Sequence, residues 1–394
     1  MTDAPLVVFV LQIKQPLTVD PAEAMPRADT EVVVLAAPGG GSPLREDVSH
    51  TRARVITTAP DDWETVIKEL AAGKPFEIAA NDEYALPRCQ ELRDRFGLVA
   101  RHPRPLNGYL DKLVMKQRLA VGGVETARFA GIDRVTVDPV AAARLLADLG
   151  TPVVVKPRQE ANSRGVELLS TVDEVVAWQR KREGEIGWHV EEFLTGDQYH
   201  VNALVRGNSV TPIQVGRYLG PLLNLQDGRR LGGISVPDGD AIVAPAHAMN
   251  ERVVRALGGG DFVVHTEFMV RPDSRLTVLE VAARAPGAMV SEMSRLRYGV
   301  QMEHANLRLQ MGVDPGVPTG TGLHAGWVWV PVMPGESFTR MPSPRSESDV
   351  HVRRAARSRY EGSAGTLGAS VLLWNTDLAQ LNRDVEYVTA WDWT

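Results

Sequence analysis

Two acidic residues, Glu267 and Glu280, have the types and spacing best suited to chemistry in this chain. They lie in two apolar, β-like runs that flank the turn-forming residues Pro272, Asp273 and Ser274. If the turn is centred between Asp273 and Ser274, the pairing places the two glutamates directly opposite each other. Their Cβ atoms are then about 5 Å apart on one face. We therefore predict a β-hairpin that brings two carboxylates together.

Two carboxylates placed in this way repel each other unless a positive charge lies between them. Their apolar neighbours add to the cost of leaving the charges unpaired. A hard divalent cation removes both problems, because it takes carboxylate oxygens and keeps coordination positions open for phosphate. The alternative is a solvated face on which each glutamate is paired with an arginine. The hairpin alone leaves both interpretations open, and Glu267 and Glu280 are candidate ligands of Mg²⁺, or of Mn²⁺ in its place.

A histidine shares the predicted face of the hairpin with the two glutamates. The same register places His265 opposite Ala282. Its side chain could orient a carboxylate or contact a substrate. The alternative is that it is a structural histidine with satisfied hydrogen bonds.

Two lysines are placed where they could bind phosphate. Lys156 ends a buried strand and enters the loop 157–166, whose small residues leave backbone N–H groups free to cradle phosphates. Lys112 lies in the first turn of a predicted helix, where the helix dipole disfavours a cation. An anionic ligand nearby would explain that position. The alternative for each lysine is a solvated surface position.

The elements that position these residues begin with strands and helices that alternate near the N-terminus. This alternation favours an open, largely parallel α/β sheet in a lobe that ends near residue 107. Strands are predicted over residues 5–10, 31–36, 54–58 and 76–80, and helices over 61–73 and 87–96.

The rest of the chain reads as mixed α and β structure. The segment 216–240 is rich in Gly, Pro and Arg and has no clear period, which is typical of a functional or disordered loop. The last segment, from about residue 318, is predicted as an α+β lobe. Helices are predicted over 111–123, 138–150, 171–183 (with a capping box, Thr171 with Glu174) and 376–383, and strands over 151–157, 188–194, 200–205, 325–332 and 368–375.

Composition excludes several classes of function. The 394 residues are 44% hydrophobic and 23% charged, with a net charge of −6, so there is no general electrostatic reason to bind nucleic acid or anionic lipid. No apolar run reaches the roughly 18 residues that span a bilayer, and the N-terminus does not resemble a signal peptide. The single cysteine, Cys89, is expected to be a small buried residue, and a cytoplasmic location is expected.

Taken in order, these motifs resemble the ATP-grasp superfamily, and in particular the carboxylate–amine ligases related to biotin carboxylase and to bacterial L-amino-acid ligases. The resemblance covers residues 111 to 312 and extends to the N-terminal lobe through the stretch 81–98. It implies a Rossmann-like α/β domain over 1–107 and an ATP-grasp domain over 108–315, with a small lid subdomain over about 112–190. A C-terminal lobe over 316–394 would complete the core.

The resemblance also assigns roles to single residues. Lys112 and Lys156 would bind the nucleotide, and the loop after Lys156, with Ser163, would cover its phosphates. The stretch 190–196 would form the hinge that holds adenine, and Glu267 and Glu280 would be the metal ligands. Adenine would contact Glu191 and the backbones of Phe193 and Leu194, the catalytic residues would be Arg284 and Lys156, and the substrate would contact His265, Arg217, Arg229 and Arg230.

Two positions depart from the family pattern. The family often has an acidic residue where Gln198 stands, to hold the ribose hydroxyls, and the neighbouring Asp197 is an alternative for that role. Ala282 replaces the asparagine of the usual E-x-N-x-R motif. A water molecule or His265 could fill the gap that this replacement leaves at the metal site.

The activity implied by the resemblance is ATP-dependent ligation. A carboxylate is activated as an acyl phosphate and joined to an amine, so that an amide or peptide bond forms and ADP and phosphate are released. The expected partners are ATP, Mg²⁺ and small-molecule acids and amines, namely amino acids, and relatives of biotin carboxylase are often homodimers. The segment 216–240 and the loop after Lys156 are candidate lids. The alternatives are another ATP-grasp reaction, such as carboxylation through carboxyphosphate, and a nucleotide-binding protein without catalysis.

Overall fold

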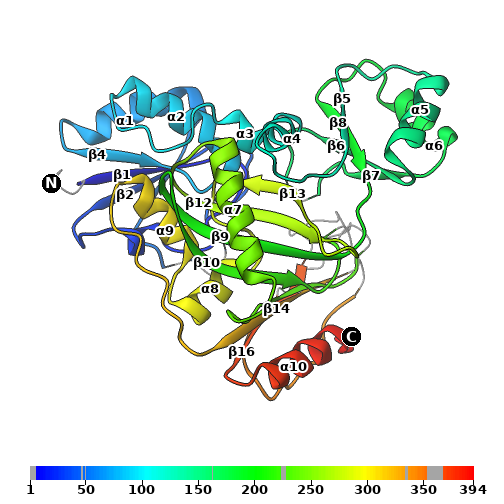
Figure 1. Ribbon diagram of the computed structural model, residues 1–394. Coiled ribbons are helices and arrows are strands. Elements are labelled where there is room, and N and C mark those ends of the chain that lie inside the picture. Colours follow the sequence, from blue (N-terminus) through cyan, green and yellow to red (C-terminus); the bar gives the residue numbers. More distant parts are fainter. Residues whose placement is uncertain are drawn as a thin grey trace.

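Three β-sheets organise the described part of the chain, and each is built from its own stretch of sequence (Figure 1). The computed structural model describes residues 6–45, 48, 50–161, 163–222, 228–332, 336–352 and 367–394. Figure 1 shows the small middle sheet with its two helices standing apart from the other two layers.

The N-terminal lobe is an open parallel sheet, as predicted. Its strand order is β3-β2-β1-β4, and every pairing is parallel. Strand β1 is buried on both faces: Phe9 packs against the helices α1 and α2, and Val8 packs against η1 and the later helix α9 (Met302–Gln310). The lobe contains β1 (Val7–Gln12), β2 (Glu31–Ala36), β3 (Arg54–Thr57), β4 (Phe76–Ala79), η1 (Pro21–Ala24), η2 (Pro60–Asp62), α1 (Trp63–Ala71), η3 (Glu83–Ala85) and α2 (Leu86–Arg95).

The small sheet is antiparallel, with strand order β5-β8-β6-β7. One face carries Val153, Val155 and Val190 into a core with the two helices, so strand alternation turns Lys156 and Glu191 toward the other face. The predicted capping box at Thr171 is confirmed. The elements are β5 (Phe129–Ile132), α5 (Pro139–Leu149), β6 (Val153–Pro157), β7 (Glu167–Leu169), α6 (Val172–Lys181) and β8 (Trp188–Glu192).

The large sheet has eight described strands in the order β13-β12-β9-β10-β11-β14-β16-β15. One face packs on α4 and α7, the opposite face packs on α8 and α9, and α10 covers the C-terminal strands. The strands are β9 (Asp197–Gly207), β10 (Ser209–Tyr218), β11 (Leu231–Ser235), β12 (Gly260–Val270), β13 (Leu276–Ala282), β14 (His324–Pro331), β15 (Glu347–Val352) and β16 (Leu367–Asn375). The helices are α3 (Asn107–Leu110), α4 (Lys112–Val121), α7 (Val243–Leu257), α8 (Val290–Tyr298), α9 (Met302–Gln310) and α10 (Leu378–Ala390).

The segment 216–240 differs from the irregular loop that was predicted. Its start belongs to β10, and residues 231–235 form β11, while residues 223–227 lie outside the described part. No strand was predicted here because glycine, at Gly232 and Gly233, is uncommon in strands. A Cβ on Gly233 would lie 2.7 Å from Nε1 of Trp327, so glycine is required where β11 passes this indole on β14.

The predicted start of the small subdomain differs from the packing. Met115 and Leu119 of α4 belong to the core of the large sheet, so the small sheet with its own core begins at Phe129 and not at Lys112. The C-terminal strands β14 to β16 continue the large sheet, which the C-terminal segment completes.

Two further predictions can be compared with the structure. Cys89 is fully buried against the N-terminal sheet, as predicted, and burial raises the pKa of its thiol to about 12. Among the helices that the structure describes, none is long and apolar enough to cross a membrane.

Candidate active site

A cavity of about 840 Å³ lies where the three sheets meet. Lys14 and Tyr84 line it from the N-terminal lobe, Val154 from the small sheet and Met269 from the large sheet. This volume is within the range of roughly 300–1,000 Å³ that is usual for ligand sites. The predicted site residues that line it are Lys112, Lys156, Ser163, Glu191, Phe193, Leu194, Gln198, His265, Glu267, Glu280 and Arg284.

The predicted pairing of the two glutamates is confirmed. Glu267 on β12 pairs with Glu280 on β13, and His265 pairs with Ala282. Both glutamates face the cavity.

The turn that produces this pairing is not the predicted one. Arg271 N donates to the carbonyl of Arg275 over 2.9 Å, so the turn is centred on Asp273 and not between Asp273 and Ser274. A bulge at Leu279 then shifts the register by one residue. Because of this bulge, Leu279 and Glu280 both reach the cavity, whereas a regular hairpin would place Leu279 opposite Glu267.

The two glutamates have different neighbours. Glu267 accepts hydrogen bonds from the Tyr218 hydroxyl (3.1 Å) and from Nε2 of Gln198 (3.2 Å). Glu280 pairs with Nζ of Lys112 at 3.0 Å. Burial raises the pKa of Glu280, but Lys112 and the other nearby cations outweigh it and hold the pKa below its ordinary value. Glu280 is therefore a charged carboxylate, as a metal ligand must be.

The carboxylate pair suits a magnesium ion. Within the described residues, no three His, Cys, Asp or Glu side chains are gathered closely enough to hold a metal by themselves. Magnesium, however, is usually bound through one or two carboxylates together with phosphate oxygens. The oxygens of Glu267 and Glu280, which face each other across the hairpin, fit that arrangement.

Glu191 is held between two lysines, one of which was not predicted. Its carboxylate forms ion pairs with Lys156 and, at 2.7 Å, with Lys116. Burial raises the pKa of Glu191, but the two lysines hold it well below its ordinary value. Lys116 is 1% exposed, and it lies one helical turn after Lys112 on α4. That spacing was the signal in the sequence, because residues four apart share a face of a helix.

Lys112 occupies the start of α4 because Asp111 caps that helix. The Asp111 carboxylate accepts from the backbone N–H groups of Leu113 and Val114 and pairs with Arg158 at 2.6 Å. The Lys112 ammonium reaches the carbonyl of Glu160 at 2.5 Å. Burial lowers the pKa of Lys112, but the Glu280 and Glu83 carboxylates outweigh it and raise the pKa above its ordinary value.

The loop after Lys156 closes over the cavity from one side and contacts the N-terminal lobe. The Tyr84 hydroxyl donates to Glu160 over 2.8 Å and accepts from the N–H of Ala161 over 3.3 Å. Lys14 lies over the Tyr84 ring and 3.6 Å from the Glu160 carboxylate. Ser163 follows with φ of 55°, which turns the loop back toward β7. None of these N-terminal contacts was predicted, because they join residues far apart in sequence.

An apolar cluster lines part of the cavity beside the predicted hinge segment 190–196. Leu194, Ala127 and Met269 pack together, and Leu279 from the bulge packs against them. The predicted hinge residue Phe193 is 38% exposed. The cluster provides an apolar surface next to the charged groups, which suits a planar heterocycle with attached phosphates.

Arg284 reaches the cavity from the end of β13 and is held by the N-terminal lobe. Its Nε and Nη2 lie 3.0 and 2.9 Å from Oε2 of Glu83, and its Nη1 donates to the carbonyl of Ala285. Burial lowers the pKa of Arg284, but Glu83 outweighs it and raises the pKa above its ordinary value. Glu83 therefore fixes the position of this guanidinium.

Four predicted residues are not brought to the cavity. Asp197 is exposed and lies on the opposite face of β9 from Gln198, so of these two only Gln198 faces the cavity. Arg217 likewise alternates with the cavity-lining Tyr218 on β10 and faces away. Arg230 donates to the carbonyl of Thr389 on α10, and Arg229 is exposed and outside the lining. The cations that line the cavity instead, besides those predicted, are Lys14, Arg45 and Arg164.

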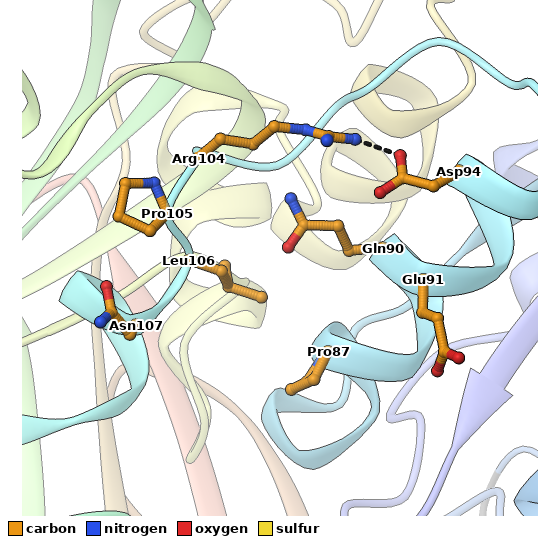
Figure 2. A pocket seen from close by; sticks show the side chains of 8 residues that line it. All are labelled: Pro87, Gln90, Glu91, Asp94, Arg104, Pro105, Leu106 and Asn107. Atoms are coloured by element: carbon orange, nitrogen blue, oxygen red, sulfur yellow. Dashed lines mark hydrogen bonds and ion pairs between the residues drawn. The ribbon is translucent and has the colours of Figure 1, made fainter.

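A second hollow lies on the surface between α2 and the segment before α3 (Figure 2). Figure 2 shows Arg104 paired with Asp94 across it. It contains none of the predicted site residues. The deep cavity is therefore the candidate active site.

Comparison with known proteins agrees with this arrangement. The sequence is 22% identical over 261 residues to an L-arginine-specific L-amino acid ligase of Bacillus subtilis. The aligned region covers 64% of this chain and 62% of that protein. The structure matches an L-amino acid ligase from Bacillus licheniformis with a TM-score of 0.73 at 18% identity, over 98% of this chain and 97% of that one. It matches an N5-carboxyaminoimidazole ribonucleotide synthetase in complex with ADP with a TM-score of 0.71 at 15% identity, over 98% of each chain. No family model matches.

These likenesses show the fold: the chain has the ATP-grasp fold. The match to the curated relative covers less than two thirds of that protein's length. Activity and substrates are therefore argued from the site itself.

Proposed function

We propose that this protein is an ATP-dependent carboxylate–amine ligase that forms an amide or peptide bond through an acyl phosphate. The observation that carries the proposal is the convergence of Lys112, Lys156, Glu267, Glu280 and Arg284 on one cavity beside an apolar cluster. Two lysines, two facing carboxylates and a half-buried guanidinium are groups that suit phosphoryl transfer to a carboxylate.

In this proposal, adenine lies against the cluster of Leu194, Met269 and Leu279, and the ribose lies near Gln198. The phosphates contact Lys112 and Lys156 under the loop that follows β6. Lys156 exchanges Glu191 for a phosphate oxygen, and Lys116 keeps the Glu191 carboxylate paired when it does so. The buried Glu191 carboxylate therefore keeps a cation throughout the exchange. A buried carboxylate without a cation would be costly in free energy.

The chemistry follows from charge. The substrate carboxylate and the γ-phosphate repel each other, so the chain must supply positive charge where they meet. The lysines supply it at the phosphates, and Arg284 supplies it where the acyl phosphate and the later tetrahedral intermediate carry their negative charge. Glu267 and Glu280 would hold a magnesium ion, which when bound would supply further charge neutralisation for the phosphates. The amine then attacks the acyl carbon, and phosphate leaves.

The acid and the amine are amino acids in this proposal. The cavity is also lined by Arg45, which pairs with Glu292 at 3.0 Å, and by the buried carboxyl of Glu303. An amino acid presents a carboxylate, which matches Arg45, and an ammonium group, which can donate to the Glu303 carboxyl. The likeness to L-amino acid ligases supports the same substrate class.

The test is a screen of amino-acid pairs with ATP and Mg²⁺, in which ADP, phosphate and the coupled product are measured. We expect ADP and phosphate in equal amounts, and a hydroxamate when hydroxylamine replaces the amine. Release of AMP and pyrophosphate would replace the proposal with an adenylating mechanism. Turnover that depends on bicarbonate would favour carboxylation, and binding of ATP without turnover would favour a non-catalytic protein.

A further inference from the structure

His265 lies beside the metal-binding glutamate with one ring nitrogen toward it. Its Nε2 is 3.3 Å from Oε1 of Glu267, and the side chain lines the cavity. The residue paired with it across the hairpin is Ala282, whose methyl group offers no metal ligand. His265 is thus placed where the chain could replace a missing polar ligand.

The other ring nitrogen of His265 is held by a buried amide. Its Nδ1 is 2.8 Å from Oδ1 of Asn202, and the Asn202 amide nitrogen is 2.8 Å from Nδ1 of His200. Asn202 and His200 are fully buried. Because the amide oxygen can only accept, Nδ1 of His265 carries the hydrogen, and a neutral ring then has its lone pair on Nε2. Metal-binding histidines are commonly oriented in this way by a second hydrogen bond.

Nε2 of His265 and the carboxylate of Glu267 lie within hydrogen-bond distance, and Glu267 also accepts from Tyr218 and Gln198. With the hydrogen on Nδ1, the Nε2 lone pair and the carboxylate can bind one cation together. A separation of 3.3 Å suits two ligands that occupy neighbouring positions on one metal ion. We propose that His265 is a ligand of the divalent cation together with Glu267, in place of an oxygen ligand at position 282.

This inference rests on the proposed function, since the phosphates of the nucleotide must complete the coordination. It has a consequence for the choice of metal. Imidazole nitrogen binds Co²⁺ more tightly than Mn²⁺ or Mg²⁺, which both favour oxygen ligands. The chain should therefore prefer Co²⁺ to Mg²⁺ more strongly than a site with oxygen ligands alone.

The test is pulsed electron paramagnetic resonance of the complex of the full chain with Mn²⁺ and ADP, which requires no turnover. We expect electron spin-echo modulation from a directly bound ¹⁴N nucleus, replaced by ¹⁵N modulation when the histidines are ¹⁵N-labelled. The His265→Ala variant should lose the modulation and bind Mn²⁺ about tenfold more weakly or worse. The His351→Gln variant changes another cavity-lining histidine and should keep both.

A second variant separates the role of a ligand from a role in folding. His265→Ala combined with Ala282→Asn supplies an oxygen ligand from the paired position, and it should regain Mn²⁺ affinity without regaining nitrogen modulation. A wild-type complex without ¹⁴N modulation, or modulation that survives His265→Ala, would overturn the inference and leave the proposed function intact. Failure of the wild-type chain to bind ADP with Mn²⁺ would overturn the proposed function and this inference with it.

Discussion

The hydroxyl of Tyr84 in the N-terminal lobe donates a hydrogen bond of 2.8 Å to Glu160 in the loop after β6. The same oxygen accepts from the backbone of Ala161. These bonds fasten the loop that follows Lys156 to a different lobe. The position of the loop therefore depends on the N-terminal lobe.

The first prediction is that Tyr84→Phe loosens this loop. Loss of about 1 kcal/mol of hydrogen bonding should weaken ADP binding about fivefold and speed tryptic cleavage at Arg164, an exposed residue of the loop. Calorimetry and timed proteolysis would measure both effects. Tyr387→Phe on α10 is the matched control and should change neither. An unaltered cleavage rate in Tyr84→Phe would show that the bond does not hold the loop.

The second prediction concerns Glu280. Glu280→Gln removes a charged metal ligand, so turnover should fall at least about a hundredfold while the fold is retained. The assay is ADP release at saturating ATP, with circular dichroism as the check on folding. Glu69→Gln, on the exposed side of α1, should leave the rate unchanged. Unchanged turnover in Glu280→Gln would exclude Glu280 from the metal site.

The third prediction concerns Lys116, the buried lysine that was not predicted. Lys116→Met leaves Glu191 with one cation in a buried site, which should lower the free energy of unfolding by about 3 kcal/mol. It should also weaken ADP binding, because Lys156 can no longer leave Glu191. Denaturant titration and calorimetry measure these effects. The double variant with Glu191→Gln removes both partners and should recover much of the lost stability. A loss below about 1 kcal/mol would contradict the assigned pairing.

The fourth prediction is a dependence of stability on pH that is centred on Glu303. Burial, against hydrogen bonds from Thr18, raises the pKa of this carboxyl from 4.5 to about 7. A pKa that is higher in the folded state gives a contribution to stability that is present below about pH 4.5 and is lost as the pH rises through about 7. Glu303→Gln removes the titration, so its stability should fall less than that of the wild type between pH 5 and pH 8. Denaturant titration at the two pH values would measure both losses. An equal loss of stability in the wild type and in Glu303→Gln would contradict this prediction.

The fifth prediction is that Arg284 is needed for turnover and Arg217 is not. Arg284→Lys breaks the fork with Glu83 and should lower turnover by about a hundredfold or more, because an ammonium cannot make the same paired contacts. Arg217→Ala should leave turnover within about twofold, because Arg217 is on the other face of β10 from the cavity-lining Tyr218. Steady-state kinetics of both variants under one set of conditions would decide. A large loss in Arg217→Ala would show that the substrate reaches the far face.

Much of this site could be predicted because it depends on local pattern. The alternation of strands and helices predicted the parallel N-terminal sheet, and apolar runs around a turn cluster predicted the hairpin with Glu267 opposite Glu280. The lysines at the ends of a strand and a helix were found by the same local signals. The pairing was predicted correctly although the turn was not, because the bulge at Leu279 restores the register by one residue.

The sequence by itself thus determined which residues carry charge at the ends of which strands, since propensity, periodicity and turn residues act over a few positions of the chain. Only the tertiary structure decided which of those charges meet. Lys116 contacts Glu191, and Glu83 contacts Arg284, because separate parts of the fold pack together. Arg217 faces away from the cavity because of its register in one strand. Contacts between lobes and the face that a strand presents depend on packing across long separations in sequence, which no local pattern records.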